Sequence, residues 1–324
     1  MHVAVFGAGA LGSVYGVRLA LRTRARVSFV VRPSRVTSGD PLVIERVKNV
    51  RDRREEIAAP VRTSDVPGDA DVILLTVGTE DLEAIRPILD ASSGPSPSRS
   101  ARPPIIVLTP MMPADYARMR SAFGDRVLAA LAGIVAYARK EDGVVRYWMP
   151  PVVTRIDEPR AGADGDVVRE LATLLSDAGL NTHLELAVHE TNPATTVCMI
   201  PIGMSVGLAG GMEELAKDDS LLALTSRACT EGLELARRIG RPEPGVMLAP
   251  LLARPLVMST IVAALRRFNP EALFYIDEHF GRKLRAQNRV MAREIAELAR
   301  TKQVAHKAID ELGLRLEEAR LLEA

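Results

Sequence analysis

The chain has 324 residues, of which 47% are hydrophobic and 26% are charged, the composition of an ordinary soluble globular protein of about two domains. Its formal net charge of +1 gives no electrostatic case for a nucleic-acid or membrane partner, and no apolar run reaches transmembrane length. An apolar strand begins at once, without the basic region of a signal peptide, so we expect a cytoplasmic protein.

The first predicted element is a strand that leads into a glycine-rich turn. Val3 to Phe6 is followed by Gly7, Gly9 and Gly12, and the residues from Ser13 to Leu21 read as a helix. In this strand–turn–helix context, G-x-G-x-x-G spacing is typical of dinucleotide binding, with the pyrophosphate at the N-terminus of the helix. The alternative is an ordinary βα turn that happens to be rich in glycine. The predicted cofactor-binding loop comprises Gly7, Ala8, Gly9, Ala10, Leu11 and Gly12.

A cation follows the second predicted strand, Arg26 to Val31. Arg32 lies 20 residues after Gly12, where NAD-binding folds place an Asp or Glu on the ribose 2′-hydroxyl. A guanidinium, with Arg35 close behind, fits a 2′-phosphate instead. The sequence therefore favours NADP(H) over NAD(H), although Arg32 could also be a solvated charge at the end of a strand.

Strands and helices alternate through the rest of the first half. Further strands are predicted at 42–44, 59–62, 71–77, 105–108, 127–136, 144–148, 152–156 and 182–186, with helices ending at Leu89 and covering 166–178. This alternation predicts a Rossmann-type, doubly wound parallel sheet with an antiparallel addition near Tyr147. Ligands bind at the carboxyl ends of the strands in such sheets. The further cofactor-binding residues expected there are Thr76, Val77, Gly78, Thr109 and Pro110.

From about residue 188 the apolar pattern has the period of a helix, so we expect a sheet domain at 1–187 and an all-helical domain at 188–324. Asn192 and Pro193 are predicted to cap and begin a buried helix that ends at Gly210. Further helices are expected at 212–217, 221–239, 244–267 and from 269 to about 312, where Gly281 is the only internal breaker.

These motifs resemble those of the ketopantoate reductase family (2-dehydropantoate 2-reductase, the ApbA/PanE type). The run from Gly7 to Gly16 is similar to that family's opening, and Arg32 to its NADP-phosphate arginine. Cys198 to Leu215 resembles its first long helix and following turn, and Ser259-Thr260 a later hydroxyl pair. The resemblance covers most of the chain. It implies a C-terminal domain like that of 6-phosphogluconate dehydrogenase, NADPH as cofactor, and hydride transfer to a small carbonyl compound.

The chain departs from the family at the catalytic positions. Gly78 stands where the family has a lysine, and Pro110-Met111 where it has Asn-Gly. The positions of its other catalytic and substrate-binding groups align near Pro193, Val197, Pro201 and Ala272. These residues cannot transfer protons or pair with a carboxylate. We therefore do not expect ketopantoate itself as the substrate. A carbonyl substrate more apolar than ketopantoate is suggested by a set of apolar residues for which plain core packing is the alternative: Met111, Met112, Met199, Pro201 and Met204.

Four residues remain as candidates for the chemistry. His279 and Lys283 recur with Tyr275 every four residues, which would place them on one face of a helix; a solvated, charge-paired face is the alternative. Thr260 keeps a hydroxyl of the family, and Asn192 could hydrogen-bond a substrate, although capping explains it as well. The spacing of metal ligands is absent, so no metal is expected.

Three functional hypotheses stay open. The first is an NADPH-dependent oxidoreductase that acts on a small carbonyl or hydroxy compound. The second is a protein that binds NADP(H) without turnover, as a pseudoenzyme or sensor. The third is a structural homodimer whose helical domain makes the contacts, and a homodimer through that domain is also an expected partner of the enzyme.

Overall fold

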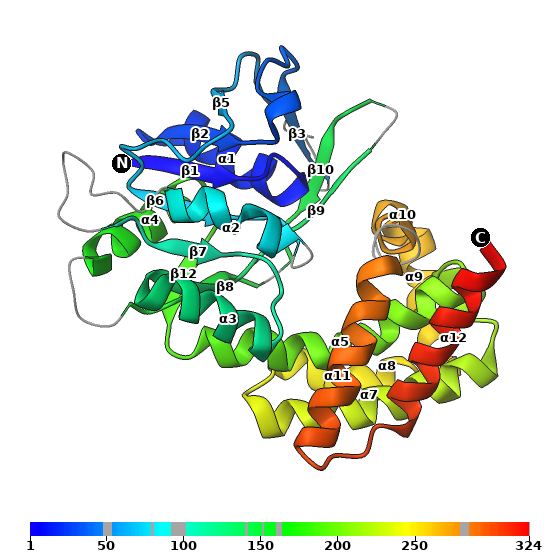
Figure 1. Ribbon diagram of the computed structural model, residues 1–324. Helices are drawn as coiled ribbons and strands as arrows, with labels where there is room; N and C mark the ends of the chain where they lie inside the picture. The colour runs from blue at the N-terminus through cyan, green and yellow to red at the C-terminus, as the bar shows by residue number, and fades with distance from the viewer. Residues whose placement is uncertain are drawn as a thin grey trace. The chain divides into compact units, whose positions relative to one another are not determined.

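A computed structural model describes residues 1–47, 54–78, 81–91, 102–139, 142–150, 152–159, 164–278 and 285–323. The chain divides into two compact units, Met1–His189 and Glu190–Ala324, a division near the expected boundary. The first unit is built on β-sheets and the second on helices (Figure 1). The predicted fold class, a doubly wound α/β domain followed by a helical one, is confirmed.

Eight strands form the main sheet of the first unit, in the order β12-β11-β8-β7-β6-β1-β2-β5. The central strands are parallel, whereas β11 runs antiparallel to β8. Because β1 lies between its parallel neighbours β2 and β6, the loops after β2 and β6 flank the loop after β1. The strands are β1 (His2–Phe6), β2 (Arg26–Val30), β5 (Arg62–Thr63), β6 (Val72–Leu75), β7 (Ile105–Val107), β8 (Val127–Leu131), β11 (Thr154–Asp157) and β12 (Thr182–Glu185).

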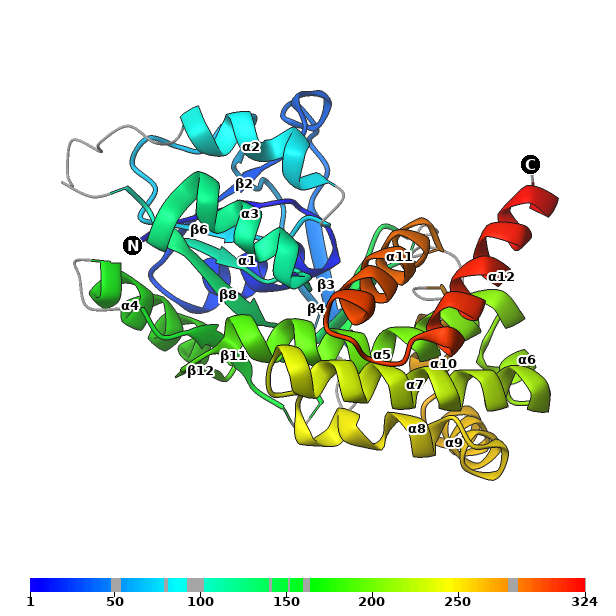
Figure 2. The same ribbon diagram turned by 60° about the horizontal axis from the view of Figure 1, so that its bottom comes forward.

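Both faces of this sheet are covered by helices. Val3 and Val5 of β1 pack in one core with α1 (Ala10–Arg22) and α4 (Asp164–Asp177). The alternate residues, Ala4 and Phe6, pack in a second core with α2 (Leu82–Ala91) and α3 (Pro113–Phe123), which lie next to each other in Figure 2. Burial on both faces explains why the central strands read as continuous apolar runs.

A second sheet packs against α1. Its four strands, in the order β4-β3-β10-β9, are β3 (Leu42–Arg46), β4 (Arg54–Ile57), β9 (Val135–Ala138) and β10 (Val145–Trp148). Arg18, in α1, has a buried side chain that contacts both the second sheet and the segment after α4. Its Nε donates to the carbonyl oxygen of Ala178 at 2.7 Å, and its Nη1 lies 3.2 Å from both Glu55 Oε2 and Tyr147 Oη. The guanidinium thus ties α1 to β4, to β10 and to the end of α4.

The sequence-based expectation for this region is wrong in two respects. The run 127–136 is not one strand but is divided between β8 and β9, which belong to different sheets. The chain turns at Gly133, where an added Cβ would lie 2.4 Å from the backbone nitrogen of Thr154. The strand of Tyr147 is not an addition to the main sheet, since β10 pairs with β9 antiparallel and with β3 parallel. The described part of this unit also contains 3₁₀ turns at Pro33–Arg35 and Gly124–Arg126.

The second unit is helical throughout its described residues. Gly232 lets two of its helices approach closely, because an added Cβ would lie 2.5 Å from the carbonyl oxygen of Val197. The helices are α5 (Val188–Ala209), α6 (Met212–Leu215), α7 (Asp219–Ile239), α8 (Ala249–Leu252), α9 (Pro255–Phe268), α10 (Pro270–Ile276), α11 (Arg285–Thr301) and α12 (Lys307–Glu323), with a 3₁₀ turn at Pro244–Leu248.

Three expectations for the helices need correction. Asn192 does not cap a helix, because α5 already begins at Val188. The single helix expected at 244–267 is broken before Pro255, whose ring disfavours helical geometry at the preceding residue. The stretch 269–312 is also interrupted, since α10 ends at Ile276 and α11 at Thr301, while Gly281 lies outside the described residues.

None of the described helices is by itself long and apolar enough to cross a membrane. The segments Pro244–Leu252 and Pro255–Phe268 reach that length and composition only together, and they are bent by 109° at their break.

Candidate functional site

The glycine loop after β1 has a geometry that only glycine supports at two of its positions. Gly7 has a φ of +100°, in the left-handed region, and its N–H donates to the carbonyl oxygen of Val30 at 3.0 Å. At Gly12, an added Cβ would lie 1.9 Å from the carbonyl oxygen of Gly7. The first turn of α1 is therefore pressed against the loop, as the spacing of the glycines predicts.

Gly9, the middle glycine of the loop, borders free space. Around an added Cβ at Gly9 the described residues place no atom within 4 Å. Gly9 is also the N-cap of α1, where no described side chain caps the helix, and the first turn, from Ala10 to Ser13, contains no acidic residue. The first intrahelical bond of this turn is that from the N–H of Ser13 to Gly9, so the preceding N–H groups lack helical acceptors. Such a terminus attracts anions.

Two threonine hydroxyls hold the surrounding loops in place. Thr76, after β6, donates its hydroxyl proton to the carbonyl oxygens of Phe6 and Gly7, at 3.0 and 3.1 Å. Thr109, after β7, is buried and donates to the carbonyl oxygen of Val77. Both were expected to contact a cofactor, yet these bonds commit their protons to the backbone. Gly78 and Pro110 extend the same edge of the sheet, and Pro110 is exposed.

A pair of opposite charges lies beside the glycine loop. Arg32, directly beyond β2, has an 81% exposed side chain, and its Nη2 lies 3.7 Å from Oδ1 of Asp81. Asp81 immediately precedes α2 and is 40% exposed. The site predicted from the sequence did not include Asp81. The feature that could have indicated it is an acidic residue shortly after a buried strand and Gly78.

A buried tyrosine anchors α1 behind the loop. Tyr15 Oη lies 2.6 Å from Oγ1 of Thr154, which also accepts from the N–H of Gly133 at 3.1 Å. Burial raises the pKa of Tyr15 to about 12. The hydroxyl is therefore a structural group that remains protonated at neutral pH.

The four candidate catalytic residues belong to the second unit or lie outside the described residues. His279 and Lys283 fall in the gap at 279–284, whereas Tyr275, their expected neighbour, is buried in α10. Thr260 is exposed and donates its hydroxyl proton to Leu256 within α9, at 2.7 Å. Asn192 is buried, and its backbone carbonyl accepts from the hydroxyl of Thr196 at 2.9 Å. The bonds of Thr260 and Asn192 each lie within a single helix and do not identify a proton donor. The choice of His279 or Lys283 as proton donor stays a prediction.

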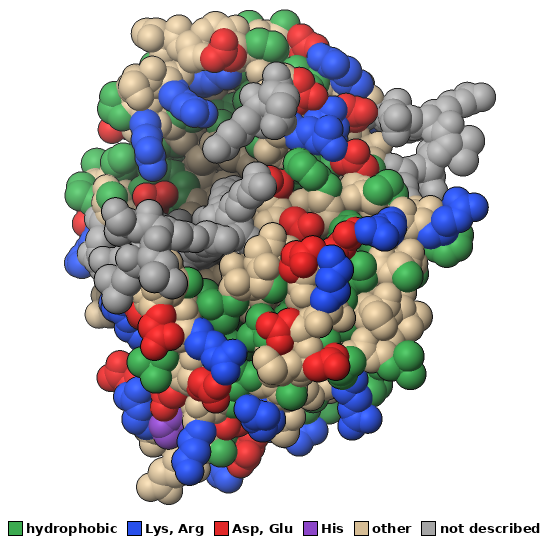
Figure 3. All heavy atoms as spheres, turned by 90° about the vertical axis from the view of Figure 1, so that its right-hand side faces the viewer, with side chains coloured by type: hydrophobic (Ala, Val, Ile, Leu, Met, Phe, Trp, Pro, Cys, Tyr) green, Lys and Arg blue, Asp and Glu red, His purple; other side chains and the backbone are tan. Residues whose placement is uncertain are grey.

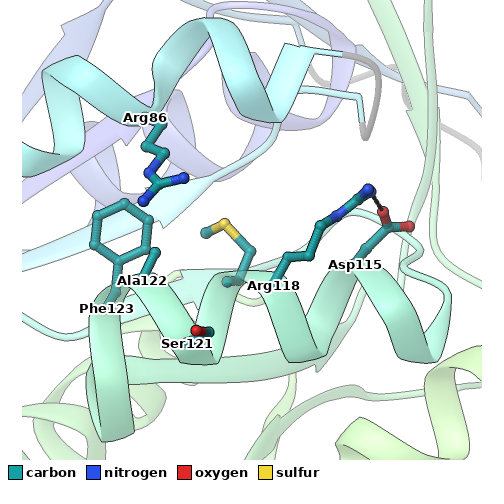
Figure 4. A pocket seen from close by; sticks show the side chains of 7 residues that line it. Arg86, Asp115, Arg118, Ser121, Ala122 and Phe123 are labelled. Atoms are coloured by element: carbon teal, nitrogen blue, oxygen red, sulfur yellow. Dashed lines mark hydrogen bonds and ion pairs between the residues drawn. The ribbon is translucent and has the colours of Figure 1, made fainter.

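A small cavity lies between α2 and α3 (Figure 4). It has a volume of about 200 Å³, and Arg86, Arg118 and Phe123 are among its lining residues. Arg118 pairs with Asp115, a buried carboxylate that also accepts from the N–H of Met112. This volume is below the roughly 300 Å³ at which ligand pockets begin. The glycine loop is therefore the better candidate for a dinucleotide.

Charges and possible metal ligands add little to this picture. On the face shown in Figure 3, positive and negative side chains are interspersed. Within the described ranges, no three side chains of His, Cys, Asp or Glu are grouped so that they could hold a metal ion. The glycine loop between β1 and α1, set in a doubly wound sheet and followed by a helical unit, defines the class: a two-unit protein with a Rossmann-type first domain.

The sequence of the first unit is similar to that of a known family. Residues 3–148 match the family model described as ketopantoate reductase PanE/ApbA. This match, over just under half of the chain, confirms for the first unit the resemblance noted from the sequence. A comparison with curated proteins found no match.

Solved structures share the fold along nearly the whole chain. A PanE/ApbA family ketopantoate reductase from Ralstonia eutropha JMP134 is 19% identical with a TM-score of 0.68, over 98% of this chain and 97% of that one. D-mandelate dehydrogenase, solved with NADH and anilino(oxo)acetate, is 17% identical with the same TM-score and coverage. The 2-dehydropantoate 2-reductase of Geobacter metallireducens GS-15 is 18% identical with a TM-score of 0.68, over 98% and 100% of the two chains. At these identities the likeness shows the fold alone.

Proposed function

We propose that this protein is an oxidoreductase that uses a nicotinamide dinucleotide to interconvert a carbonyl and a hydroxyl group. The observation that carries the proposal is the shape of the glycine loop. Gly12 packs tightly against the backbone of Gly7, whereas Gly9 borders free space beside the N-terminus of α1. A Cβ at Gly9 would fill the space in which a pyrophosphate approaches the backbone. The residues present therefore fit the cofactor, and D-mandelate dehydrogenase, solved with NADH, shares the fold.

Within this proposal each part of the site has a role. The N–H groups of the first turn of α1 bind the pyrophosphate, and Thr76 holds the loop in shape. Arg32 binds the adenosine end of the dinucleotide. Its guanidinium favours NADP(H) over NAD(H) because it can pair with the 2′-phosphate. The nicotinamide, when bound, supplies or accepts a hydride. His279 and Lys283 are the proposed proton donors, with Thr260 and Asn192 as further substrate contacts.

The proposed substrate is a small carbonyl or hydroxy compound more apolar than ketopantoate. Gly78 and Pro110 cannot donate a proton, and the hydroxyl protons of Thr76 and Thr109 are committed to backbone carbonyls. This side of the site therefore offers few groups for a substrate carboxylate. The same observation favours a second candidate function, the binding of NADP(H) without turnover.

One titration and one assay separate the candidates. NADPH, NADP⁺ and NADH are titrated by fluorescence, and loss of the nicotinamide absorbance is then followed with 2-keto acids, ketones and imines. Binding with turnover of any of these compounds supports the oxidoreductase. Tight binding with no turnover favours the second candidate. Failure to bind any of the nucleotides contradicts both.

A homodimer through the helical unit is part of the proposal. Several large apolar side chains on this unit are exposed, which is unusual for a surface that stays in water. They include Met247, Leu248, Leu251, Leu256 and Phe268 at 40%, 54%, 42%, 80% and 71% exposure. Sedimentation should show a dimer that Leu256→Lys weakens, whereas Leu21→Lys, at a half-exposed position of the sheet unit, leaves it intact. A monomer at all concentrations contradicts this part.

A further inference from the structure

The ion pair between Arg32 and Asp81 joins two segments that follow the strands on either side of β1. Arg32 follows β2 and Asp81 follows β6, and β1 lies between these two strands. Strands separated by one neighbour lie about 10 Å apart. A distance of 3.7 Å between Nη2 of Arg32 and Oδ1 of Asp81 therefore means that the two side chains reach toward each other past the end of β1.

This arrangement puts a carboxylate beside the cation that is proposed to select the cofactor. Both side chains are accessible, at 81% and 40% exposure, so a bound nucleotide can contact either. Their chemistry differs: a guanidinium donates to phosphate oxygens, whereas a carboxylate only accepts and repels them. A carboxylate near the adenosine ribose is the usual acceptor for a free 2′-hydroxyl.

We propose that Asp81 is a second determinant of cofactor choice and that it opposes Arg32, an inference that rests on the proposed nicotinamide-dependent function. Asp81 accepts a hydrogen bond from the 2′-hydroxyl of NADH, which has no phosphate there. A 2′-phosphate must instead draw Arg32 away from Asp81 and lie close to a like charge. The chain then accepts both nucleotides, and Asp81 narrows the preference for NADPH that Arg32 alone would give.

The size of the effect follows from the exposure of the pair. An exposed ion pair contributes up to about 1 kcal/mol, which corresponds to about fivefold in a dissociation constant. Repulsion of the 2′-phosphate and a stronger ribose hydrogen bond to a charged acceptor act in the same direction. Removing the charge of Asp81 should therefore raise the ratio of the NADH to the NADPH dissociation constant by about fivefold.

The test is Asp81→Asn in the full-length protein, with dissociation constants for NADPH and NADH measured by fluorescence at one ionic strength. Asn has nearly the same shape as Asp, so the substitution removes the charge with little change in side-chain volume. Asp81→Ser is a second variant that removes the charge and keeps a polar side chain. The matched control is Asp90→Asn, because Asp90 lies in α2, which Asp81 immediately precedes, and makes a comparable exposed pair with Arg86, at 3.8 Å.

Each outcome bears on one proposal. A ratio that rises in Asp81→Asn and Asp81→Ser but not in Asp90→Asn supports the role of Asp81. A ratio unchanged in both Asp81 variants, while both nucleotides still bind, overturns it and leaves the proposed function intact. If the unmodified protein binds neither nucleotide, the proposed function itself fails.

Discussion

The hydroxyl of Tyr15, in the helix that follows the glycine loop, lies 2.6 Å from the hydroxyl of Thr154 in β11. The two residues are 139 positions apart, so the bond fixes α1 against a distant strand of the same unit. Both side chains are buried, and the ring of Tyr15 is among the largest fully buried groups of the protein. The orientation of α1, and with it the anion-attracting end of the helix, depends in part on this pair.

Alkaline pH should destabilise the fold through Tyr15. Burial raises its pKa from 10.0 to about 12, so the native state holds this proton more tightly than the unfolded chain. The resulting stability is fully present below pH 10 and is lost as the pH rises to about 12. Its size is roughly 3 kcal/mol, at 1.36 kcal/mol per pKa unit. Urea unfolding across this range should show the loss, and Tyr15→Phe should reduce it; an equal loss in the variant assigns the effect to other groups.

The two cysteines should be inert in the native protein. Cys198 and Cys229 are free and buried, and burial raises the pKa of Cys198 to about 11 and that of Cys229 to about 12. At about pH 8 the reactive thiolate is therefore scarce and inaccessible. A thiol reagent should modify neither cysteine until denaturant is added, and then both. Rapid modification of the folded protein would show that α5 and α7 separate readily.

A buried amide in α11 should lower stability. Asn288 is fully buried, and neither its Oδ1 nor its Nδ2 has a hydrogen-bond partner among the described residues. An unpaired polar group of this kind costs about 1–3 kcal/mol. Asn288→Leu should therefore raise the midpoint of urea unfolding, whereas Gln287→Leu, at the adjacent and less buried position, should change it little. A clear loss of stability in Asn288→Leu would show that the amide has a partner in solution.

The two glycines of the loop should respond differently to alanine. Gly9→Ala meets open space and should leave stability unchanged while weakening nucleotide binding. Gly12→Ala places a Cβ against the Gly7 carbonyl at 1.9 Å, so it should lower both stability and binding. Thermal unfolding and fluorescence titration of the two variants test this. Equal binding by Gly9→Ala and the unmodified protein contradicts a nucleotide at this loop.

The sequence predicted most of the main sheet because its strands are buried on both faces. Continuous apolar runs such as 71–77 and 105–108, in a chain where helices alternate with them, are typical of buried parallel strands. The same property concealed the boundary between β8 and β9, since the run 127–136 stays apolar across the turn at Gly133. The strand β4, Arg54–Ile57, has a charged sequence and was not predicted, because it is stabilised by partners on β3 and α1.

The candidate site was only partly predictable, for a related reason. The glycine loop is local in sequence, so its three glycines and the following helix could be read together. The pair formed by Arg32 and Asp81 depends on strand order, which brings β2 and β6 to either side of β1. The hydroxyl bonds of Thr76 and Thr109 likewise depend on which loop lies beneath them.

The buried guanidinium of Arg18 has a consequence for local opening of the fold. Its partners Glu55 and Tyr147 lie on the second sheet, and Ala178 directly follows α4. A buried cation that loses these partners is costly, so separating the second sheet from α1 would leave an unpaired charge. We therefore expect the amides of β4 to exchange with solvent in the same opening event that exposes α1.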